Sequence, residues 1–492
     1  MNVFSEALSH IDGIYIVALI AGVVAGYIFG ALPGFSATMG VAIFVPFSYK
    51  MDVYAAFAFL IALYCAAVYA GSIPAILIRT PGTPAACATV YDGHEMAKKG
   101  EAGKALGLAC IGSVIGGIFS AIVLICSAGY IANIALKFGP HEYFALALMG
   151  LSMVVGMSSE NLIKGFAAAC FGVLLTTVGM DATVGIARFA FGNVNLMSGI
   201  QELSVMIGVF AISEVFYGIG TPERDQKIKQ NVTGLFSGVK DILENWFLVL
   251  KASILGTFLG ALPGVGGTTA AVMGYNEARR SSKHPELMGT GQPEGIIGPE
   301  TANNAVTGGA LIPMLALGIP GDPVTAILLG ALMIQGLQPG PELFSKSPDV
   351  VTGVYISIIL AYIVILLMST FSIKLFARML NIKSSILSSF VLVFCVVGVY
   401  AMQSSFFDVY VAIVFGIIGY FMRKHGFDLG PFTLAFVLGG MAEKKLGLAL
   451  KISHNNLLSF FTRPISCGLL IVTFVFLGAS IYRILKKPKQ TN

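Results

Sequence analysis

Long apolar runs alternate with short polar segments from one end of the chain to the other. A helix needs about 20 predominantly apolar residues to cross a bilayer. Runs that approach or exceed this length lie at 13–32, 53–78, 106–136, 143–159, 165–180, 203–222, 252–276, 301–321, 323–341, 350–373, 384–407, 409–422, 429–442 and 464–482. This pattern predicts an all-α integral membrane protein with roughly 11 to 14 transmembrane or re-entrant helical segments.

The most polar interior stretch divides the chain nearly in half. Residues 221–244 read TPERDQKIKQNVTGLFSGVKDILE. We therefore expect a first transmembrane repeat at 1–222, a polar central linker at 223–244 and a second repeat at 245–492 with a basic C-terminal tail. That tail and the Lys-rich segment 94–104 are expected on the cytoplasmic side, where Lys and Arg are in excess.

Composition supports a membrane-embedded chain. Hydrophobic residues make up 56% of the sequence and charged residues 11%, whereas a soluble domain carries about 25% charged residues. The net charge of +5 is attributed to cytoplasmic loops rather than to nucleic-acid binding. The seven cysteines are scattered and form no CxxC pair, so they are interpreted as small packing residues.

Two Gly- and Pro-containing motifs occur once in each half, in the same order. GALPG lies at 30–34 and again at 260–264, an offset of 230 residues. SIPAILIRTPGTPA lies at 72–85 and IPMLALGIPGDPVT at 312–325. At an offset of 239 residues the second motif pairs Pro74 with Pro313, Pro81 with Pro320, Gly82 with Gly321 and Pro84 with Pro323.

Such motifs break helices and expose backbone N–H and C=O groups. In hydrocarbon these groups are costly unless they line a cavity or bind something, so corresponding breaks in two halves indicate a transport site. The alternative is that Gly and Pro merely kink packed helices. Lys98, Lys99 and Lys104 follow the first copy of the second motif, whereas Lys346 alone follows the other copy. The positive-inside rule then predicts that the two halves are inverted.

The segments GALPGFSATMG, IRTPGTPAACATVYDG, GALPGVGGTTAAVMG and PETANNAVTGGALIPMLALGIPGDP resemble the large membrane subunit of tripartite tricarboxylate transporters, the TctA family. The resemblance covers nearly the whole chain. It implies import of carboxylates across a bacterial inner membrane, driven by an ion gradient rather than by ATP. It also implies two partners, a small membrane subunit (TctB-like) and a periplasmic substrate-binding protein (TctC-like).

The candidate substrate ligands lie at the repeated breaks. A carboxylate needs hydroxyl, backbone N–H or cationic donors, and half-helix N-termini suit anions. The hydroxyl residues could instead bond to their own helices, and the single Arg could instead extend to the membrane interface. The candidates are Gly34, Ser36, Thr38, Arg79, Thr83, Gly264, Thr268, Thr269 and Asn303.

Asn304 and Asp322 are the candidate ligands for a coupling cation, Na⁺ or a proton. An acid embedded between apolar runs is costly and is usually functional, although Asp322 could also cap a helix at the surface. Glu300 opens its segment and is interpreted as a helix cap. No other cofactor is expected.

The alternatives are a membrane-embedded enzyme and a passive anion channel. The chain has neither a GxxxxGK phosphate loop nor an HExxH zinc motif, and Tyr91-Asp92 lacks the GxGD partner of an intramembrane aspartyl protease. We therefore expect a transporter subunit and not an enzyme.

Overall fold

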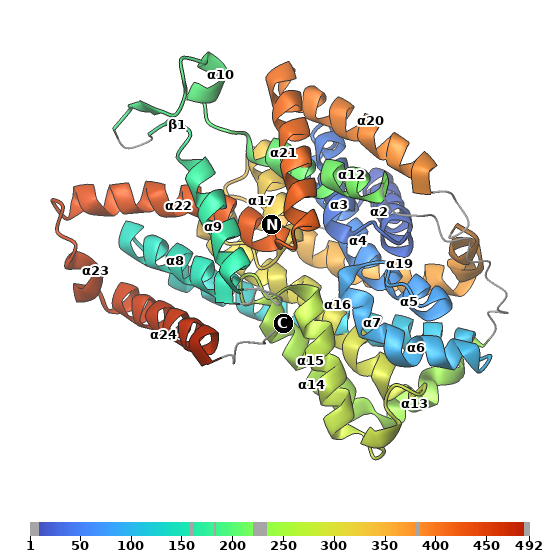
Figure 1. Ribbon diagram of the computed structural model, residues 1–492. Coiled ribbons are helices and arrows are strands. Elements are labelled where there is room, and N and C mark those ends of the chain that lie inside the picture. Colours follow the sequence, from blue (N-terminus) through green and yellow to red (C-terminus); the bar gives the residue numbers. More distant parts are fainter. Residues whose placement is uncertain (1–8, 157–161, 182–183, 220–233, 380–383, 487–492) are drawn as a thin grey trace.

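The computed structural model describes residues 9–156, 162–181, 184–219, 234–379 and 384–486 (Figure 1). These ranges are almost entirely helical, with one antiparallel hairpin of β1 (Gly179–Met180) and β2 (Ala187–Arg188). The expected all-α membrane fold is confirmed.

The first half contains α2 (Gly13–Ala31), α3 (Ala37–Ser48), α4 (Val53–Ala70), α5 (Ser72–Ile78), η1 (Pro84–Cys87), α6 (Thr89–Lys98), α7 (Ala102–Ala135), α8 (Pro140–Gly156), α9 (Leu162–Thr176), α10 (Val194–Met197), α11 (Glu202–Met206), the π-helical turn η2 (Ile207–Ile212) and α12 (Ser213–Ile219).

The second half contains η3 (Leu235–Gly238), α13 (Val239–Glu244), α14 (Trp246–Gly260), α15 (Gly266–Ser281), η4 (Pro285–Leu287), α16 (Glu294–Leu317), α17 (Pro323–Ile334), α18 (Pro341–Lys346), α19 (Pro348–Met379), α20 (Ser384–Gln403), α21 (Phe406–Lys424), α22 (Leu429–Ile452), α23 (Ser459–Thr462) and α24 (Pro464–Lys486).

Within the described ranges, five helical stretches are long and apolar enough to cross a membrane. They are Gly13–Ala31, Val53–Ile78, Ala102–Ala135, Pro348–Thr370 and Phe406–Lys424. A sixth is reached if the pair Phe236–Glu244 and Trp246–Gly260, bent by 85°, counts as one span. Five further apolar helices have 10 to 17 residues. Of the expected linker at 223–244, residues 223–233 lie outside the described residues, and 235–244 are helical.

A ladder of glycines fixes how the first helix of each half packs. In α2, a Cβ on Gly26 or Gly30 would collide with the carbonyl of Leu63 or Ala67 in α4. In α14, a Cβ on Gly256 or Gly260 would collide with the carbonyl of Ala302 or Val306 in α16. The glycines correspond at the offset of 230 and the carbonyls at the offset of 239. Small residues permit this close approach of helices, and both halves use it at the same positions.

The two halves share one core. α16 runs along α7, and α19 packs against α4 and α2. The hydroxyl of Tyr15 lies 2.7 Å from Ser357 Oγ, and that of Tyr27 lies 2.5 Å from Ser369 Oγ. Helices of one half therefore cover those of the other. The inverted orientation of the halves and the domain division at 223–244 stay predictions.

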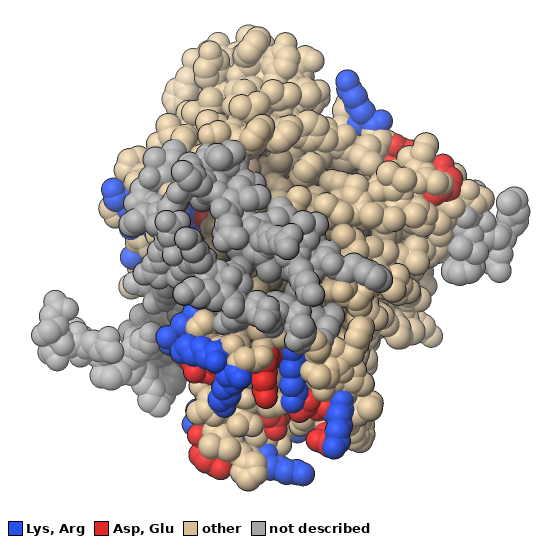
Figure 2. Space-filling model, turned by 90° about the vertical axis from the view of Figure 1, so that its right-hand side faces the viewer, with Lys and Arg blue, Asp and Glu red and all other residues tan. Residues whose placement is uncertain are grey.

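Charged side chains gather at one end of the molecule (Figure 2). In Figure 1 this lower end holds α13 and the adjoining ends of α14 and α15. Lys104 Nζ lies 3.0 Å from Asp241 Oδ2, so the start of α7 is fixed to α13 at this end. The tan surface higher up in Figure 2 is mostly uncharged, apart from a small charged group at the upper right and basic residues at the left edge.

Candidate functional site

The GALPG motif forms the same tight turn in both halves. It separates α2 from α3 and α14 from α15. Gly34 has φ +89° and Gly264 has φ +87°. The N–H of Phe35 donates to Leu32 O at 3.1 Å, and that of Val265 donates to Leu262 O at 3.3 Å. Pro followed by a glycine of positive φ is typical of a type II turn, so both copies break their helix in the same way.

The second motif also breaks both halves alike. α5 ends at Arg79 (φ +57°) and α16 ends at Gly318 (φ +70°), both left-handed. The Thr80 N–H donates to Pro74 O at 3.4 Å, and the Ile319 N–H donates to Pro313 O at 3.2 Å. Helices that end on a left-handed residue normally have Gly there. Arg79 is therefore a strained exception.

The two breaks of each half meet each other. A Cβ on Gly321 would lie 2.6 Å from the Gly260 carbonyl oxygen, and a Cβ on Gly82 would collide with the Gly30 carbonyl. The halves also cross over: η1 contacts α15, and α17 contacts α3. All four breaks thus belong to one central junction, which we call the break junction and define by the segments 30–38, 79–85, 260–269 and 318–325.

On one side of the break junction a buried carboxylate accepts three hydrogen bonds. Asp322 caps α17 and is 5% exposed. Its Oδ1 accepts the Thr325 N–H at 2.8 Å and the Thr325 hydroxyl at 2.8 Å. Its Oδ2 accepts the hydroxyl of Tyr64, from α4, at 2.6 Å. Asp322 is thus a helix cap, as the alternative held, but a buried one rather than a surface one.

On the other side, buried polar atoms lack partners. Asn303 is 1% exposed and Thr83 is 4% exposed. Among the described residues, neither the Asn303 side-chain oxygen and nitrogen nor Thr83 Oγ1 has a hydrogen-bond partner. A Cβ on Gly267 would collide with Asn303 Oδ1 and would lie 3.2 Å from Ala85 Cβ. Leaving such groups unpaired costs about 1–3 kcal/mol each, so this is the place in the break junction where a polar ligand gains most.

The helices that follow the two GALPG turns begin differently. Ser36 caps α3 by accepting the Met39 N–H at 3.1 Å. α15 has no side-chain cap at its N-terminus, where its sequence is GGTT. Thr268 of that first turn is exposed, and Thr269 is half-buried. The N-terminus of α15 therefore offers N–H donors and a partial positive charge beside Asn303.

The remaining predicted substrate ligands are less enclosed. Gly34 and Arg79 are exposed, and Ser36, Thr38 and Gly264 are half-buried. All belong to the break junction by their segments. Among the predicted ligands, only Thr83 and Asn303 combine deep burial with unpartnered polar atoms.

Asn304 points away from Asn303, toward α7. Its Nδ2 donates to Ser113 Oγ at 2.7 Å and to the Glu300 carbonyl at 3.1 Å. The Glu300 carboxylate is fully buried and accepts hydrogen bonds from Ser113 and Thr89. Glu300 lies inside α16, which begins at Glu294, so its interpretation as a helix cap was wrong. This network holds α16 to α6 and α7.

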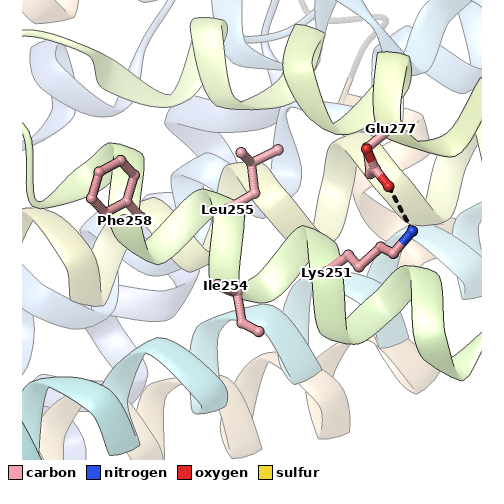
Figure 3. Close-up of a pocket in the computed structure, with 5 residues that line it drawn as sticks. All are labelled: Lys251, Ile254, Leu255, Phe258 and Glu277. Carbon is pink, nitrogen blue, oxygen red and sulfur yellow. Dashed lines mark hydrogen bonds and ion pairs between the residues drawn. The ribbon is translucent and has the colours of Figure 1, made fainter. Parts of the chain in front are cut away.

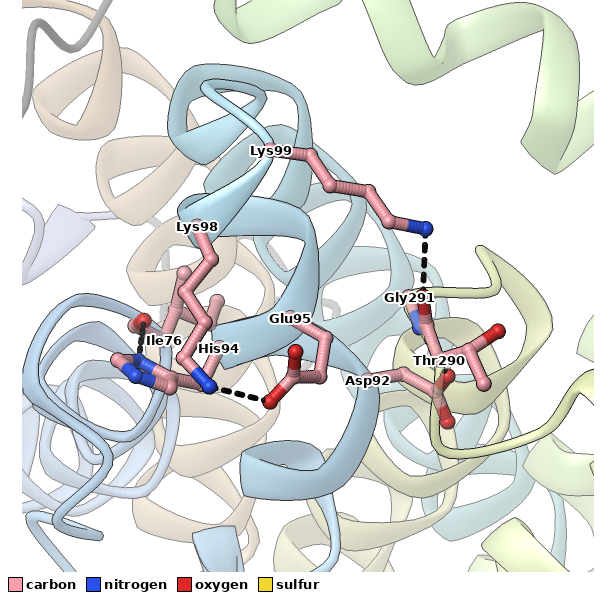
Figure 4. Close-up of polar contacts among 8 residues, drawn as sticks. All are labelled: Ile76, Asp92, His94, Glu95, Lys98, Lys99, Thr290 and Gly291. Carbon is pink, nitrogen blue, oxygen red and sulfur yellow. Dashed lines mark hydrogen bonds and ion pairs between the residues drawn. The ribbon is translucent and has the colours of Figure 1, made fainter.

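Asp92, which sequence reasoning set aside, clamps the loop that precedes α16 (Figure 4). Its Oδ1 accepts the N–H groups of Gly291 and Gln292, both at 2.8 Å, and that of Gly289 at 2.9 Å. Its Oδ2 accepts the Tyr275 hydroxyl at 2.9 Å. One buried carboxylate thus binds α6 to α15 and to the segment that leads into α16.

Charged neighbours of this clamp lie at the surface (Figure 4). Lys99 Nζ donates to the Thr290 carbonyl at 2.6 Å, which adds a second link to the same loop. Lys98 Nζ lies 2.7 Å from Glu95 Oε1 and lowers the pKa of that carboxyl. Exposed pairs of this kind contribute little to stability, so the buried Asp92 determines the loop's position.

A groove of about 370 Å³ lies apart from the break junction, on the outer face of α14 (Figure 3). Apolar side chains of Ile254, Leu255 and Phe258 line it, and the ion pair of Lys251 with Glu277, 2.9 Å long, closes one end. Ile254 and Phe258 are exposed on the outside of the molecule. In a membrane such a surface faces lipid, so the groove is not the candidate site.

Comparisons with known proteins agree with the resemblance of the motifs. The model of the tripartite tricarboxylate transporter TctA family matches residues 16–434. An uncharacterised 52.8 kDa protein in the TAR-I ttuC' 3' region of Agrobacterium vitis is 36% identical over 470 residues, 95% of this chain and 93% of that protein. An uncharacterised protein in the TAR-II ttuC' 3' region of the same organism is 37% identical over 215 residues, 44% of this chain and 89% of that protein. No solved structure matches.

Proposed function

The chain belongs to the tripartite tricarboxylate transporter TctA family, and on that premise we propose that it is the large transmembrane subunit of a binding-protein-dependent carboxylate importer. It acts as a secondary transporter in a bacterial inner membrane, driven by a Na⁺ or proton gradient. The substrate binds at the break junction, between the two halves.

The break junction is the observation that carries this proposal. Two helix breaks from each half converge there, and buried donors remain unpartnered at Thr83 and Asn303. Broken helices at corresponding positions are the usual site of substrate and ion binding in secondary transporters. Neutral amide, hydroxyl and helix N-terminal donors suit a carboxylate.

The coupling cation is proposed to bind on the Asp322 side of the same junction. A carboxylate has about four lone-pair sites, and three hydrogen bonds reach that of Asp322. A cation there would offset the charge of an anionic substrate bound nearby. Asn304 is the second proposed cation ligand, through its side-chain oxygen Oδ1, which accepts the Tyr362 hydroxyl at 3.4 Å.

Two partner subunits complete the proposed transporter. A periplasmic substrate-binding protein delivers the carboxylate, and a small membrane subunit assembles with this chain. The charged end of the molecule carries Lys104, at the start of α7, and the adjoining α13. Under the positive-inside rule it faces the cytoplasm, so the binding protein docks on the opposite end.

Uptake into proteoliposomes tests this proposal. The chain is reconstituted with both cognate partners, and uptake of labelled citrate, succinate and benzoate is followed with a Na⁺ gradient, a proton gradient or neither. We expect gradient-driven accumulation of at least one carboxylate, which stops when the binding protein is omitted. Equilibration without any gradient or binding protein would instead indicate the passive channel, and chemical conversion of the carboxylate would indicate an enzyme.

An Asp322→Asn variant tests the cation assignment separately. It keeps the shape of the helix cap and removes the charge. We expect its uptake to lose dependence on the coupling gradient. Unchanged ion dependence would remove Asp322 from the cation site while leaving the importer proposal intact.

A further inference from the structure

We propose that the transported carboxylate is held between Thr83 and Asn303. There it takes the part that the protein's own Asp322 carboxylate takes on the other side of the break junction. This inference rests on the proposed function and specifies its site. It follows from comparing the two sides of the break junction position by position.

The two sides correspond through the offset of 239 residues that aligns the second motif. At this offset Thr83 pairs with Asp322, and Tyr64 pairs with Asn303. The same offset relates the helix-end hydrogen bonds of Thr80 to Pro74 and of Ile319 to Pro313. The glycine ladder also follows it, because α4 and α16 present corresponding carbonyls. The correspondence is therefore one of contacts as well as of letters.

On the Asp322 side of the break junction, a carboxylate of the protein links α4 to the start of α17. Asp322 Oδ2 accepts the Tyr64 hydroxyl at 2.6 Å, and Oδ1 accepts the Thr325 N–H at 2.8 Å. The chain of contacts runs from a side chain of the long helix, through a carboxylate, to the start of the next helix. Every polar atom in this chain of contacts has a partner.

On the Thr83 side of the break junction, the donors are present but the acid is not. Asn303 stands where Tyr64 stands, and its amide is buried without a partner. Thr83 stands where Asp322 stands, precedes η1, and makes no capping bond with its side chain. The hydroxyl and the amide N–H can both donate to oxygen. A carboxylate from outside the chain supplies the acceptor that this side of the break junction lacks.

The uncapped N-terminus of α15 strengthens this assignment. Gly267 lies directly against Asn303 Oδ1, so the first-turn N–H groups of this 16-residue helix lie beside the amide. On the Asp322 side of the break junction, Ser36 satisfies the corresponding end of α3. The Thr83 side of the break junction therefore adds a helix terminus that stabilises negative charge. All of its donors are neutral, which suits a single carboxylate head.

Isosteric and truncating variants test this inference in the complete reconstituted complex. Thr83→Val removes only the hydroxyl, and Asn303→Ala removes the amide. A hydrogen bond to a charged group is worth enough that each variant should weaken half-saturation for the transported carboxylate by about ten- to a hundredfold. Thr301→Val is the matched control, because Thr301 is also buried with an unpartnered hydroxyl but faces Gly112 of α7.

A second variant rebuilds the arrangement of the Asp322 side on the Thr83 side of the break junction. Thr83→Asp combined with Asn303→Tyr supplies an internal carboxylate and hydroxyl at the paired positions. We expect this double variant to lose uptake. If it does not fold, the single variants decide the question.

The outcomes separate the two proposals. If the wild type takes up no carboxylate from the panel, the proposed function fails. If the wild type transports and Thr83→Val, Asn303→Ala and Thr301→Val all match it, or if the double variant transports normally, the function stands and this inference is overturned. Selective loss in the Thr83 and Asn303 variants supports the inference.

Discussion

Replacing Gly82 by Ala tests whether the two breaks of each half must touch. The new Cβ would lie 2.0 Å from the Gly30 carbonyl oxygen, 2.8 Å from Pro74 Cγ and 3.0 Å from Gly71 Cα. Two of these three atoms belong to the backbone, so no side-chain rotation relieves the collision. The breaks must separate by roughly 1 Å to restore an ordinary contact.

Overpacking a close-packed interior typically costs about 1–3 kcal/mol and sometimes more. We expect Gly82→Ala to lower the free energy of unfolding by about 3 kcal/mol, at the upper end because backbone must move. The corresponding Gly321→Ala places its Cβ 2.6 Å from Gly260 O and 2.7 Å from Ala310 Cα. It should cost slightly less, about 2–3 kcal/mol.

Denaturant titration and thermal unfolding of the purified chain in detergent measure both costs. Gly129→Ala is the control, because a Cβ there meets nothing within 4 Å and Ala favours a helix interior by about 0.5–1 kcal/mol. If Gly82→Ala and Gly321→Ala are no less stable than this control, the breaks do not meet as described. Similar losses from both would support the shared geometry of the halves.

Asp92→Ala should destabilise the chain by about 3 kcal/mol or more, because three buried loop N–H groups lose their acceptor; a loss below that of Tyr275→Phe in denaturant titration would contradict the clamp. Arg79→Gly should raise stability by about 1 kcal/mol, because it relieves a left-handed backbone, and a lower melting temperature would refute this. Thr301→Val should be neutral or stabilising and Thr307→Val destabilising by about 1 kcal/mol, since only the Thr307 hydroxyl is bonded; the reverse order of melting temperatures would contradict that.

Local chemistry explains which parts of the fold could be predicted from sequence. The position of each break was predictable because Pro presets φ and Gly accepts positive φ within a few residues of chain. The apolar runs likewise located the long spans α2, α4 and α7. The helical course of 235–244 was not predicted, because its polar composition is equally typical of a linker.

Contacts between distant residues explain what the sequence could not provide. Asp322 could be singled out as an embedded acid, but its partner Tyr64 lies 258 residues away. Glu300 was misread because it opens the polar segment that the sequence shows, whereas α16 begins at Glu294 and continues through Pro299. Asp92 was passed over because the loop it holds is about 200 residues distant, and no local pattern indicates such a contact.

The central claim is that a carboxylate binds at the break junction. Cryo-electron microscopy of the complete complex in lipid nanodiscs, with the transported member of the carboxylate panel bound, tests it most directly. The account predicts carboxylate density within hydrogen-bond distance of Thr83 Oγ1 and Asn303 Nδ2, beside the N-terminus of α15. Density elsewhere, for example in the outer groove beside Phe258, with Thr83 and Asn303 unoccupied, would contradict it.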